Sequence, residues 1–248
     1  MSDKKKKDHK RELSAFDRLL MKIKNPILRS ITEWAVLIVA ALIIAKTING
    51  VLIANCNVPT GSMIETIQPG DRVIGSRLNY TFGEPEHGDV AIFRFGWRCM
   101  YCKDYFEEPA EDICPSCGKK QLFTLPVYYV KRVIGVPGDV IEIRPEGSCD
   151  PSEIVSGALG PAAARETRKM VTAAVYRNGE KLEENYLREP MLYSGDMTFT
   201  VPEGCYFMLG DNRNQSADAR YWNDPYVSKD RMKAKVLFRY WKGFSIIR

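Results

Sequence analysis

The sequence predicts a mainly β protein that carries one N-terminal transmembrane helix and a small four-cysteine insertion. From Val58 onward, short runs with the alternation of β-strands are separated by turns rich in Gly, Pro and Asp. Helical periodicity is confined to residues 14–54, which include one long apolar run, and two Cys-x-x-Cys pairs lie close together in the β region. A chain of 248 residues is long enough to bury a hydrophobic core.

The net charge of +5 belongs to the N-terminal tail and not to the body of the chain. Residues 1–30 contain ten Lys or Arg and four Asp or Glu, which leaves 26 basic and 27 acidic residues over positions 31–248. A nearly neutral body argues against nucleic-acid binding. Basic residues before an apolar segment favour the cytoplasmic side of a membrane. Residues 1–30 are therefore predicted to be a cytoplasmic basic tail and juxtamembrane segment, and residues 55–248 an extracytoplasmic domain.

Residues 31–54 are predicted to form a single-pass transmembrane helix in contact with membrane lipid, since about 20 apolar residues cross a bilayer. Glu33 and Lys46 interrupt the run near its ends, where their side chains can reach opposite interfaces. The alternatives are a buried amphipathic helix and a cleavable signal peptide, although no small-residue cleavage pattern clearly follows the run. Residues 14–29 are expected to form a short amphipathic helix on the membrane, closed by Asn25-Pro26.

The region after the apolar run contains eight segments with the pattern of strands or strand pairs: residues 71–78, 88–95, 127–136, 138–144, 173–182, 197–204, 205–211 and 234–241. Residues 145–170 lack this pattern and are expected to be an insertion. We predict a smaller sub-domain over residues 145–195.

Four cysteines within residues 97–120 have the spacing C-x2-C-x11-C-x2-C: Cys99, Cys102, Cys114 and Cys117. Two such pairs can bring four thiolates to the tetrahedral geometry of a structural Zn²⁺ site. The alternative is a set of disulfides, because the segment is predicted to face an oxidising compartment. The insertion offers no His or carboxylate at ligand spacing, so its role is expected to be structural or in partner contact.

Ser62 follows a glycine in a tight turn just after the apolar run, where it could be a nucleophile or a turn residue. A serine nucleophile needs a base, which is usually histidine. The chain has two histidines: His9 lies in the tail, and His87 lies in a turn where a solvated side chain is the simpler interpretation. A Ser-His-Asp triad is thus nearly excluded, unless His87 folds back onto the site.

Lys131 is the alternative base, because burial in an apolar run lowers the pKa of a lysine from about 10.4. Strand alternation places Lys131 on one face of the segment 127–136 and Arg132 on the other, and an arginine cannot act as the base. From this segment alone, Lys131 could equally reach out of an ordinary strand into solvent. Residues 210–220 (GDNRNQSADAR) form a polar loop that offers a hydroxyl and carboxylates to orient a catalytic amine.

Three segments together resemble the signature boxes of type I signal peptidases, in the family's order and after an N-terminal anchor. They are Thr60-Gly61-Ser62-Met63, residues 129–139 (YVKRVIGVPGD) and residues 210–220. The similarity runs from about residue 30 to the end. It implies a signal-peptidase-like antiparallel β-sheet catalytic domain. The four-cysteine insertion is not part of the family's core.

The resemblance implies a role for each matching residue. Ser62 is the expected nucleophile and Lys131 its general base. Thr60 stands where the family usually has a serine whose hydroxyl, with the Ser62 N–H, forms the oxyanion hole. The remaining expectations are a hydrogen bond from Ser216 to the lysine amine, a buried Asp218–Arg220 pair that braces the site, and substrate binding by Met63 and Tyr129. The sequence departs from the family at three positions: Glu65 replaces a proline, Ile67 a leucine and Ala219 a serine.

The expected function is that of a membrane-anchored serine endopeptidase that removes signal peptides from exported preproteins through an acyl-enzyme. The chemistry needs no cofactor, and a structural Zn²⁺ is expected in the four-cysteine insertion. The resemblance also implies small residues at the first and third positions before the cut. The alternatives are a self-cleaving Ser/Lys protease of the LexA-like class and a non-enzymatic membrane protein that binds a partner through its zinc knuckle.

Overall fold

The structure, a computed structural model, describes residues 25–106, 113–120, 124–155, 169–241 and 243–247. The chain divides into two compact units, residues 1–50 and residues 51–248. Of the amphipathic helix predicted at residues 14–29, positions 14–24 lie outside the described residues.

The apolar run forms helix α2 (Pro26–Thr47), which continues as a π-helical segment over Ile48–Leu52. The side chain of Asn25 caps the helix by accepting a hydrogen bond from Ile27 N–H at 2.9 Å, and Pro26 occupies the first turn, where its missing N–H costs nothing. Asn25-Pro26 therefore starts helix α2. The 27 residues Pro26–Leu52 include an 18-residue window with a mean hydropathy of 2.3, and the helix is long and apolar enough to cross a membrane.

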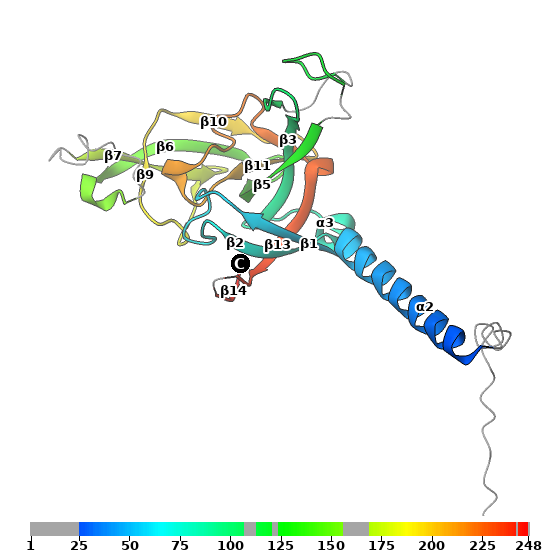
Figure 1. Cartoon of the computed structure of the whole chain (residues 1–248). Coiled ribbons are helices and arrows are strands. Elements are labelled where there is room, and N and C mark those ends of the chain that lie inside the picture. Colours follow the sequence, from blue (N-terminus) through cyan, green and yellow to red (C-terminus); the bar gives the residue numbers. More distant parts are fainter. Residues whose placement is uncertain (1–24, 107–112, 121–123, 156–168, 242, 248) are drawn as a thin grey trace, which may run out of the picture. The chain divides into compact units, whose positions relative to one another are not determined.

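The second unit is built on antiparallel strands, as expected, and its larger sheet has nine strands among the described residues (Figure 1). The strand order is β1-β2-β13-β3-β5-β11-β12, with β4 paired to β3 and β14 paired to β13. The strands are β1 (Ile53–Val58), β2 (Asp71–Ser76), β3 (Val90–Cys99), β4 (Tyr105–Phe106), β5 (Thr124–Gly135), β11 (Cys205–Leu209), β12 (Tyr226–Ser228), β13 (Met232–Arg239) and β14 (Ser245–Ile246).

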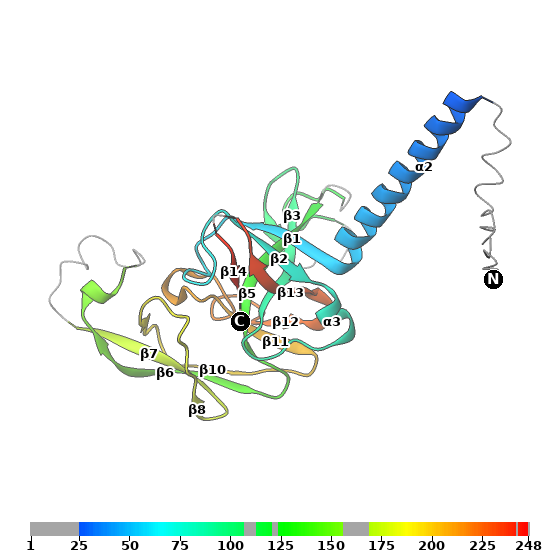
Figure 2. The same cartoon turned by 90° about the horizontal axis from the view of Figure 1, so that it is seen from below.

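A smaller sheet extends from one side of the larger one, and its long hairpin of β6 and β7 is clear in Figure 2. Its order is β10-β6-β7-β8, with β9 paired to β7. The strands are β6 (Val140–Cys149), β7 (Met170–Arg177), β8 (Glu180–Lys181), β9 (Met191–Leu192) and β10 (Met197–Thr200). The end of β6 and the strands β7, β8 and β9 fall within residues 145–195, where a smaller sub-domain was predicted, and residues 156–168 lie outside the described residues.

Short helices connect the strands: α3 (Leu78–Phe82) and the 3₁₀ turns η3 (Pro151–Glu153), η5 (Arg213–Gln215) and η6 (Lys229–Arg231). All eight predicted strand segments contain strands. The predictions missed β1, whose Ile53 and Ala54 had been assigned to the membrane helix, and the short strands β4, β9, β12 and β14.

Strand β11 connects the two parts of the core, because its alternating side chains enter different clusters. Phe207 and Leu209 pack with residues of the smaller sheet, whereas Tyr206 and Met208 pack with side chains of β3 and β5. All four are at most 1% exposed. Burial of a large apolar side chain contributes roughly 1.5–3 kcal/mol to the free energy of folding. β11 is therefore held firmly in the core and fixes the start of the polar loop that follows it at Gly210.

Candidate active site

Ser62 lies on a loop that leaves the edge strand β1 and returns to β2. A hydrogen bond of 2.7 Å from Gly70 N–H to the Val58 carbonyl closes the loop. Met63 and Ile67 are fully buried in the apolar core and anchor it there. Ser62 is thereby held at the surface of the core, with 8% of its area exposed.

The loop after β11 holds the backbone of this serine in place. The Asn212 N–H donates to the Ser62 carbonyl at 3.0 Å, and the Asn212 side-chain amide donates to the Gly61 carbonyl at 3.0 Å. Gly210 makes this close approach possible, since a Cβ atom there would lie 2.5 Å from the Ser62 carbonyl oxygen and 2.2 Å from Ser216 Oγ. Any larger residue at position 210 would push the two loops apart.

Lys131 reaches the serine from the middle of β5. Its Nζ lies 2.6 Å from Ser62 Oγ, and only 4% of the residue is exposed. Burial lowers the pKa of Lys131 to about 8, although the nearby carboxylates of Asp218 and Asp211 oppose this shift. A substantial fraction of the amine is therefore neutral near pH 8 and can accept the serine proton.

His87 lies apart from this pair. Its Nε2 is 2.6 Å from a carboxylate oxygen of Asp139, and it lines a separate cavity with residues such as Glu84 and Tyr206. The structure thus gives Ser62 a lysine partner and His87 an aspartate partner.

A cleft of about 690 Å³ opens at Ser62 and Lys131 between the end of β1 and the first half of β5. Thr60 lies on its wall beside Ser62, and Tyr129 lines it while stacking on Phe95 with ring centroids 4.3 Å apart. The full lining is Cys56, Asn57, Val58, Pro59, Thr60, Ser62, Ile92, Tyr105, Val127, Tyr128, Tyr129, Val130, Lys131, Gln215 and Ala217.

The cleft is bordered by strand edges that can pair with a peptide. β1 is the first strand of its sheet, and β11 pairs with β5 only from Arg132 to Gly135 within the described residues. An extended chain placed in the cleft would meet backbone groups of both β1 and β5. Met63 was predicted to bind substrate, but it is not part of this lining. Its side chain is fully buried in the core.

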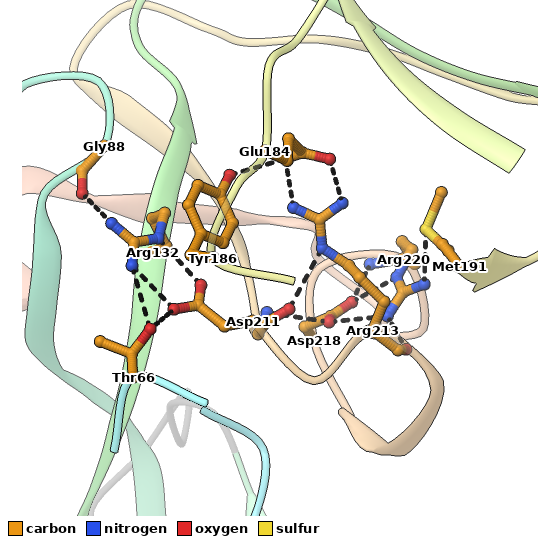
Figure 3. Close-up of polar contacts among 11 residues, drawn as sticks. Thr66, Gly88, Arg132, Glu184, Tyr186, Met191, Asp211, Arg213, Asp218 and Arg220 are labelled. Atoms are coloured by element: carbon orange, nitrogen blue, oxygen red, sulfur yellow. Dashed lines mark hydrogen bonds and ion pairs between the residues drawn. The ribbon is translucent and has the colours of Figure 1, made fainter. Parts of the chain in front are cut away.

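Asp218 and Arg220 form a buried ion pair behind the site. Arg220 binds the two Asp218 oxygens at 2.7 and 2.9 Å (Figure 3). Asp218 also accepts a hydrogen bond from Gly210 N–H at 3.1 Å. The Arg220 guanidinium further donates to the Arg213 carbonyl at 2.6 Å. These bonds fix the loop that carries Asn212 and hence the position of Ser62.

Ser216 is buried close to Gly210. The expected hydrogen bond between its hydroxyl and the Lys131 amine is not formed. Among the described residues, Ser216 Oγ has no hydrogen-bond partner, and the lysine amine is directed to Ser62 instead.

The structure adds a second buried ion pair that the sequence analysis missed, between Arg132 and Asp211. Arg132 binds both Asp211 oxygens, at 2.9 and 2.7 Å, and donates to the Gly88 carbonyl at 2.7 Å, while Thr66 also donates to Asp211 (Figure 3). The signal was available: an arginine on an apolar strand needs a buried acidic partner. Sequence alone does not identify which of the acidic residues it meets.

Arg213 makes a third such pair, with Glu184, whose carboxylate also accepts from Tyr186 at 2.6 Å. Buried ion pairs therefore hold the loop between β11 and β12 in place. The sequence analysis predicted a polar loop here but did not predict these ion pairs.

The contact between Ser62 and Lys131 is typical of serine hydrolases in which a buried lysine is the general base for the serine nucleophile. The model of the family "Signal peptidase, peptidase S26" matches residues 31–149 and 165–241. The chain belongs to this family.

Named relatives agree with the family. The chain is 29% identical over 205 residues to signal peptidase I of Pseudomonas aeruginosa, covering 76% of this chain and 62% of that protein. It is 26% identical over 204 residues to a probable signal peptidase I of Synechocystis, covering 82% and 79%. It is 27% identical over 185 residues to thylakoidal processing peptidase 1 of Arabidopsis thaliana, covering 75% and 41%. The match thus spans under two thirds of the Pseudomonas and Arabidopsis relatives.

Proposed function

We propose that this chain is a membrane-anchored signal peptidase that removes N-terminal signal peptides from exported preproteins. The observation that carries the proposal is the buried 2.6 Å contact between Lys131 Nζ and Ser62 Oγ, two residues that line a cleft of about 690 Å³ in a chain of this family.

The first half of the reaction forms an acyl-enzyme. Neutral Lys131 accepts the Ser62 proton while Oγ attacks the carbonyl carbon of the scissile bond. The negative oxygen of the tetrahedral intermediate accepts hydrogen bonds from the Thr60 hydroxyl and the Ser62 N–H, and one such donor contributes roughly 3 kcal/mol. Protonated Lys131 then gives its proton to the leaving amine, and the C–N bond breaks.

The second half releases the signal peptide. Lys131, neutral again, accepts a proton from water, and the resulting hydroxide attacks the ester carbonyl of acylated Ser62. Collapse of this intermediate returns the proton to Ser62 Oγ. None of these steps uses a metal or an organic cofactor.

The substrate is an extended segment of a preprotein. The unpaired edges of β1 and β5 supply backbone donors and acceptors, and the apolar lining, including Val58, Ile92 and Val130, favours apolar side chains. Small residues at the first and third positions before the cut, as the family resemblance implies, would fit close to Ser62.

The basic tail supports an orientation with the N-terminus in the cytoplasm and the β unit on the far side of the membrane. In this orientation α2 contacts lipid, and the nearly neutral β unit faces exported proteins and not nucleic acid. The helix and its π-helical extension end at Leu52, so only about ten residues separate the anchor from Ser62.

Cleavage of a model preprotein tests the proposal. Purified full-length chain in detergent is expected to release a mature product whose new N-terminus lies at the signal-peptide junction, as determined by mass spectrometry. Ser62→Ala should abolish cleavage, whereas the exposed Ser148→Ala on β6 should not change it. Cleavage by the Ser62→Ala protein, or a cut only at unrelated sites, would refute the assignment.

A further inference from the structure

Four cysteine sulfurs converge at the end of β3, outside the catalytic pair. The sulfurs of Cys99 and Cys117 lie 3.6 Å apart, those of Cys102 and Cys114 lie 3.7 Å apart, and all four lie within 4.8 Å of one another. Tetrahedral Zn²⁺ with Zn–S bonds of about 2.3 Å places its ligands roughly 3.8 Å apart. The cluster therefore has the dimensions of a four-thiolate metal site.

The two Cys-x-x-Cys pairs are presented by turns with the same backbone pattern. In the first, Lys103 N–H donates to the Cys99 carbonyl at 3.0 Å and Cys99 N–H donates to the Asp104 carbonyl at 2.9 Å. The same two bonds recur fifteen residues later at Cys114, from Gly118 N–H at 2.9 Å and to the Lys119 carbonyl at 2.6 Å. Two turns of one shape that face each other are suited to grip a single ion.

The backbone at the fifth position of each turn is consistent with a metal site. Lys103 and Gly118 both adopt positive φ, 67° and 69° respectively. Glycine does so readily, but a lysine there is held against its preference. Ordering two such turns in a short segment costs conformational free energy. The binding free energy of a metal ion would compensate for this cost.

The first of these turns leads directly into the wall of the catalytic cleft. Asp104, whose carbonyl is bonded to Cys99, is followed by Tyr105 in β4. Tyr105 pairs with Arg98 of β3, whose guanidinium lies 5.3 Å from the centre of its ring, and lines the same cleft as Ser62 and Lys131. The position of this aromatic wall thus depends on the cysteine cluster.

We propose that Cys99, Cys102, Cys114 and Cys117 bind one Zn²⁺, and that this ion holds Tyr105 against the cleft and so strengthens substrate binding without taking part in the chemistry. Four soft thiolates in tetrahedral array favour zinc over hard cations such as Mg²⁺ or Ca²⁺. The role of Tyr105 rests on the proposed function of the cleft, whereas the metal site does not.

Metal analysis tests the site itself. Full-length protein purified without added metal is expected to contain one zinc per chain, and unfolding it in the presence of a chelator should reveal seven titratable thiols. Cys102→Ser and Cys117→Ser should each lose the zinc, and the control Cys205→Ser should keep it. Absence of metal with only three free thiols would mean disulfides, and bound iron with visible absorption would mean a different metal; either result overturns the proposal.

Substrate affinity tests the link to the cleft, and it can be measured without turnover in the Ser62→Ala background. Tyr105→Ala is expected to weaken binding of a signal-junction peptide by about three- to tenfold. Zinc removal should weaken binding to the same extent in protein with Tyr105 and have little further effect in Tyr105→Ala, and re-addition of zinc should restore it. Tyr101→Ala, in the same turn but outside the cleft lining, is the matched control.

The turnover of active protein separates the outcomes. Tyr105→Ala and zinc removal should raise KM and leave kcat within about twofold. Loss of kcat at constant KM, or unchanged peptide binding after zinc removal, would contradict the role given to Tyr105. If the wild-type protein binds one zinc but cleaves no preprotein, the metal site stands and the proposed function fails.

Discussion

At the scale of single residues, the chemistry depends on placing one lysine where water cannot solvate its charge. Lys131 is 4% exposed and directed at Ser62 Oγ, whereas Arg132, the next residue, points to the opposite face and is neutralised by Asp211. Strand alternation is enough to separate the two side chains. It also explains how two adjacent cations can have different roles, since Lys131 is the proposed base and Arg132 forms a buried ion pair that supports the fold.

Lys131→Arg is expected to abolish cleavage, with a loss of at least about 10³-fold in kcat/KM, because an arginine keeps the charge but cannot lose its proton. The measurement is preprotein turnover, with circular dichroism to verify folding. Lys233→Arg on β13 provides a control for the same exchange away from the site. Turnover by the Lys131→Arg protein close to that of wild type would remove the lysine from the mechanism.

Thr60→Val should lower kcat by roughly 10²–10³-fold with little change in KM, since it removes one donor to the oxyanion and keeps the shape of the side chain. Thr198→Val, exposed on β10, is the matched control. Full activity of Thr60→Val would mean that other groups form the oxyanion hole.

Several residue-level features could be predicted, and others could not. The serine, the lysine and the Asp218–Arg220 pair follow from motif positions and from the absence of a suitable histidine. The burial of Met63 and the missing bond of Ser216 do not, because a motif shows which residues are near the site but not which way each side chain turns. The partner of Arg132 lies 79 positions away in the sequence, beyond the reach of any local pattern.

At the scale of elements, the active site forms where two loops meet beside strand β5. The loop after β1 carries Ser62, the loop after β11 carries Asn212, and β5 carries Lys131 between them. The strands were predictable because their alternation is regular. β1 was missed because its first residues continue the apolar run of the helix, and hydrophobicity alone does not show where a helix gives way to an edge strand.

Asp211→Asn is expected to destabilise the β unit by about 3–5 kcal/mol, because it leaves the buried Arg132 charge unpaired. Chemical denaturation followed by tryptophan fluorescence measures the loss, and the exposed Asp224→Asn controls for the same chemical change. The double variant Arg132→Met with Asp211→Leu should be less destabilised than the two single losses combined. Destabilisation by Asp211→Asn below about 1 kcal/mol would show that the pair does not brace the fold.

At the scale of the whole molecule, an apolar helix with its π-helical extension is followed directly in the chain by β1, the first strand of the unit that holds the site. The apolar side chains of α2 are exposed, with Leu37 and Leu42 at 61% and 64%, as expected of a helix whose solvent is lipid. In the proposed function, such a helix would hold the β unit close to a membrane surface.

Replacing Leu37 and Leu42 together by Asp is expected to release the protein from membranes, since each charge near the centre of a span costs about 2.5–3.5 kcal/mol. Alkaline carbonate extraction of cell membranes measures retention, and the Leu37→Ala, Leu42→Ala protein is the control. An Asp variant that resists extraction as well as wild type would argue against a spanning helix.

The central claim is that neutral Lys131 is the base for Ser62, and the pH dependence of kcat/KM for preprotein cleavage tests it most directly, because this quantity reports the ionisations of the free enzyme. Burial lowers the pKa of Lys131 to about 8, and the proposed mechanism uses the neutral amine. The account therefore predicts that kcat/KM rises with pH through a midpoint near 8 and then levels off, with the same midpoint in His87→Ala. A midpoint between 6 and 7 that disappears in His87→Ala would contradict it.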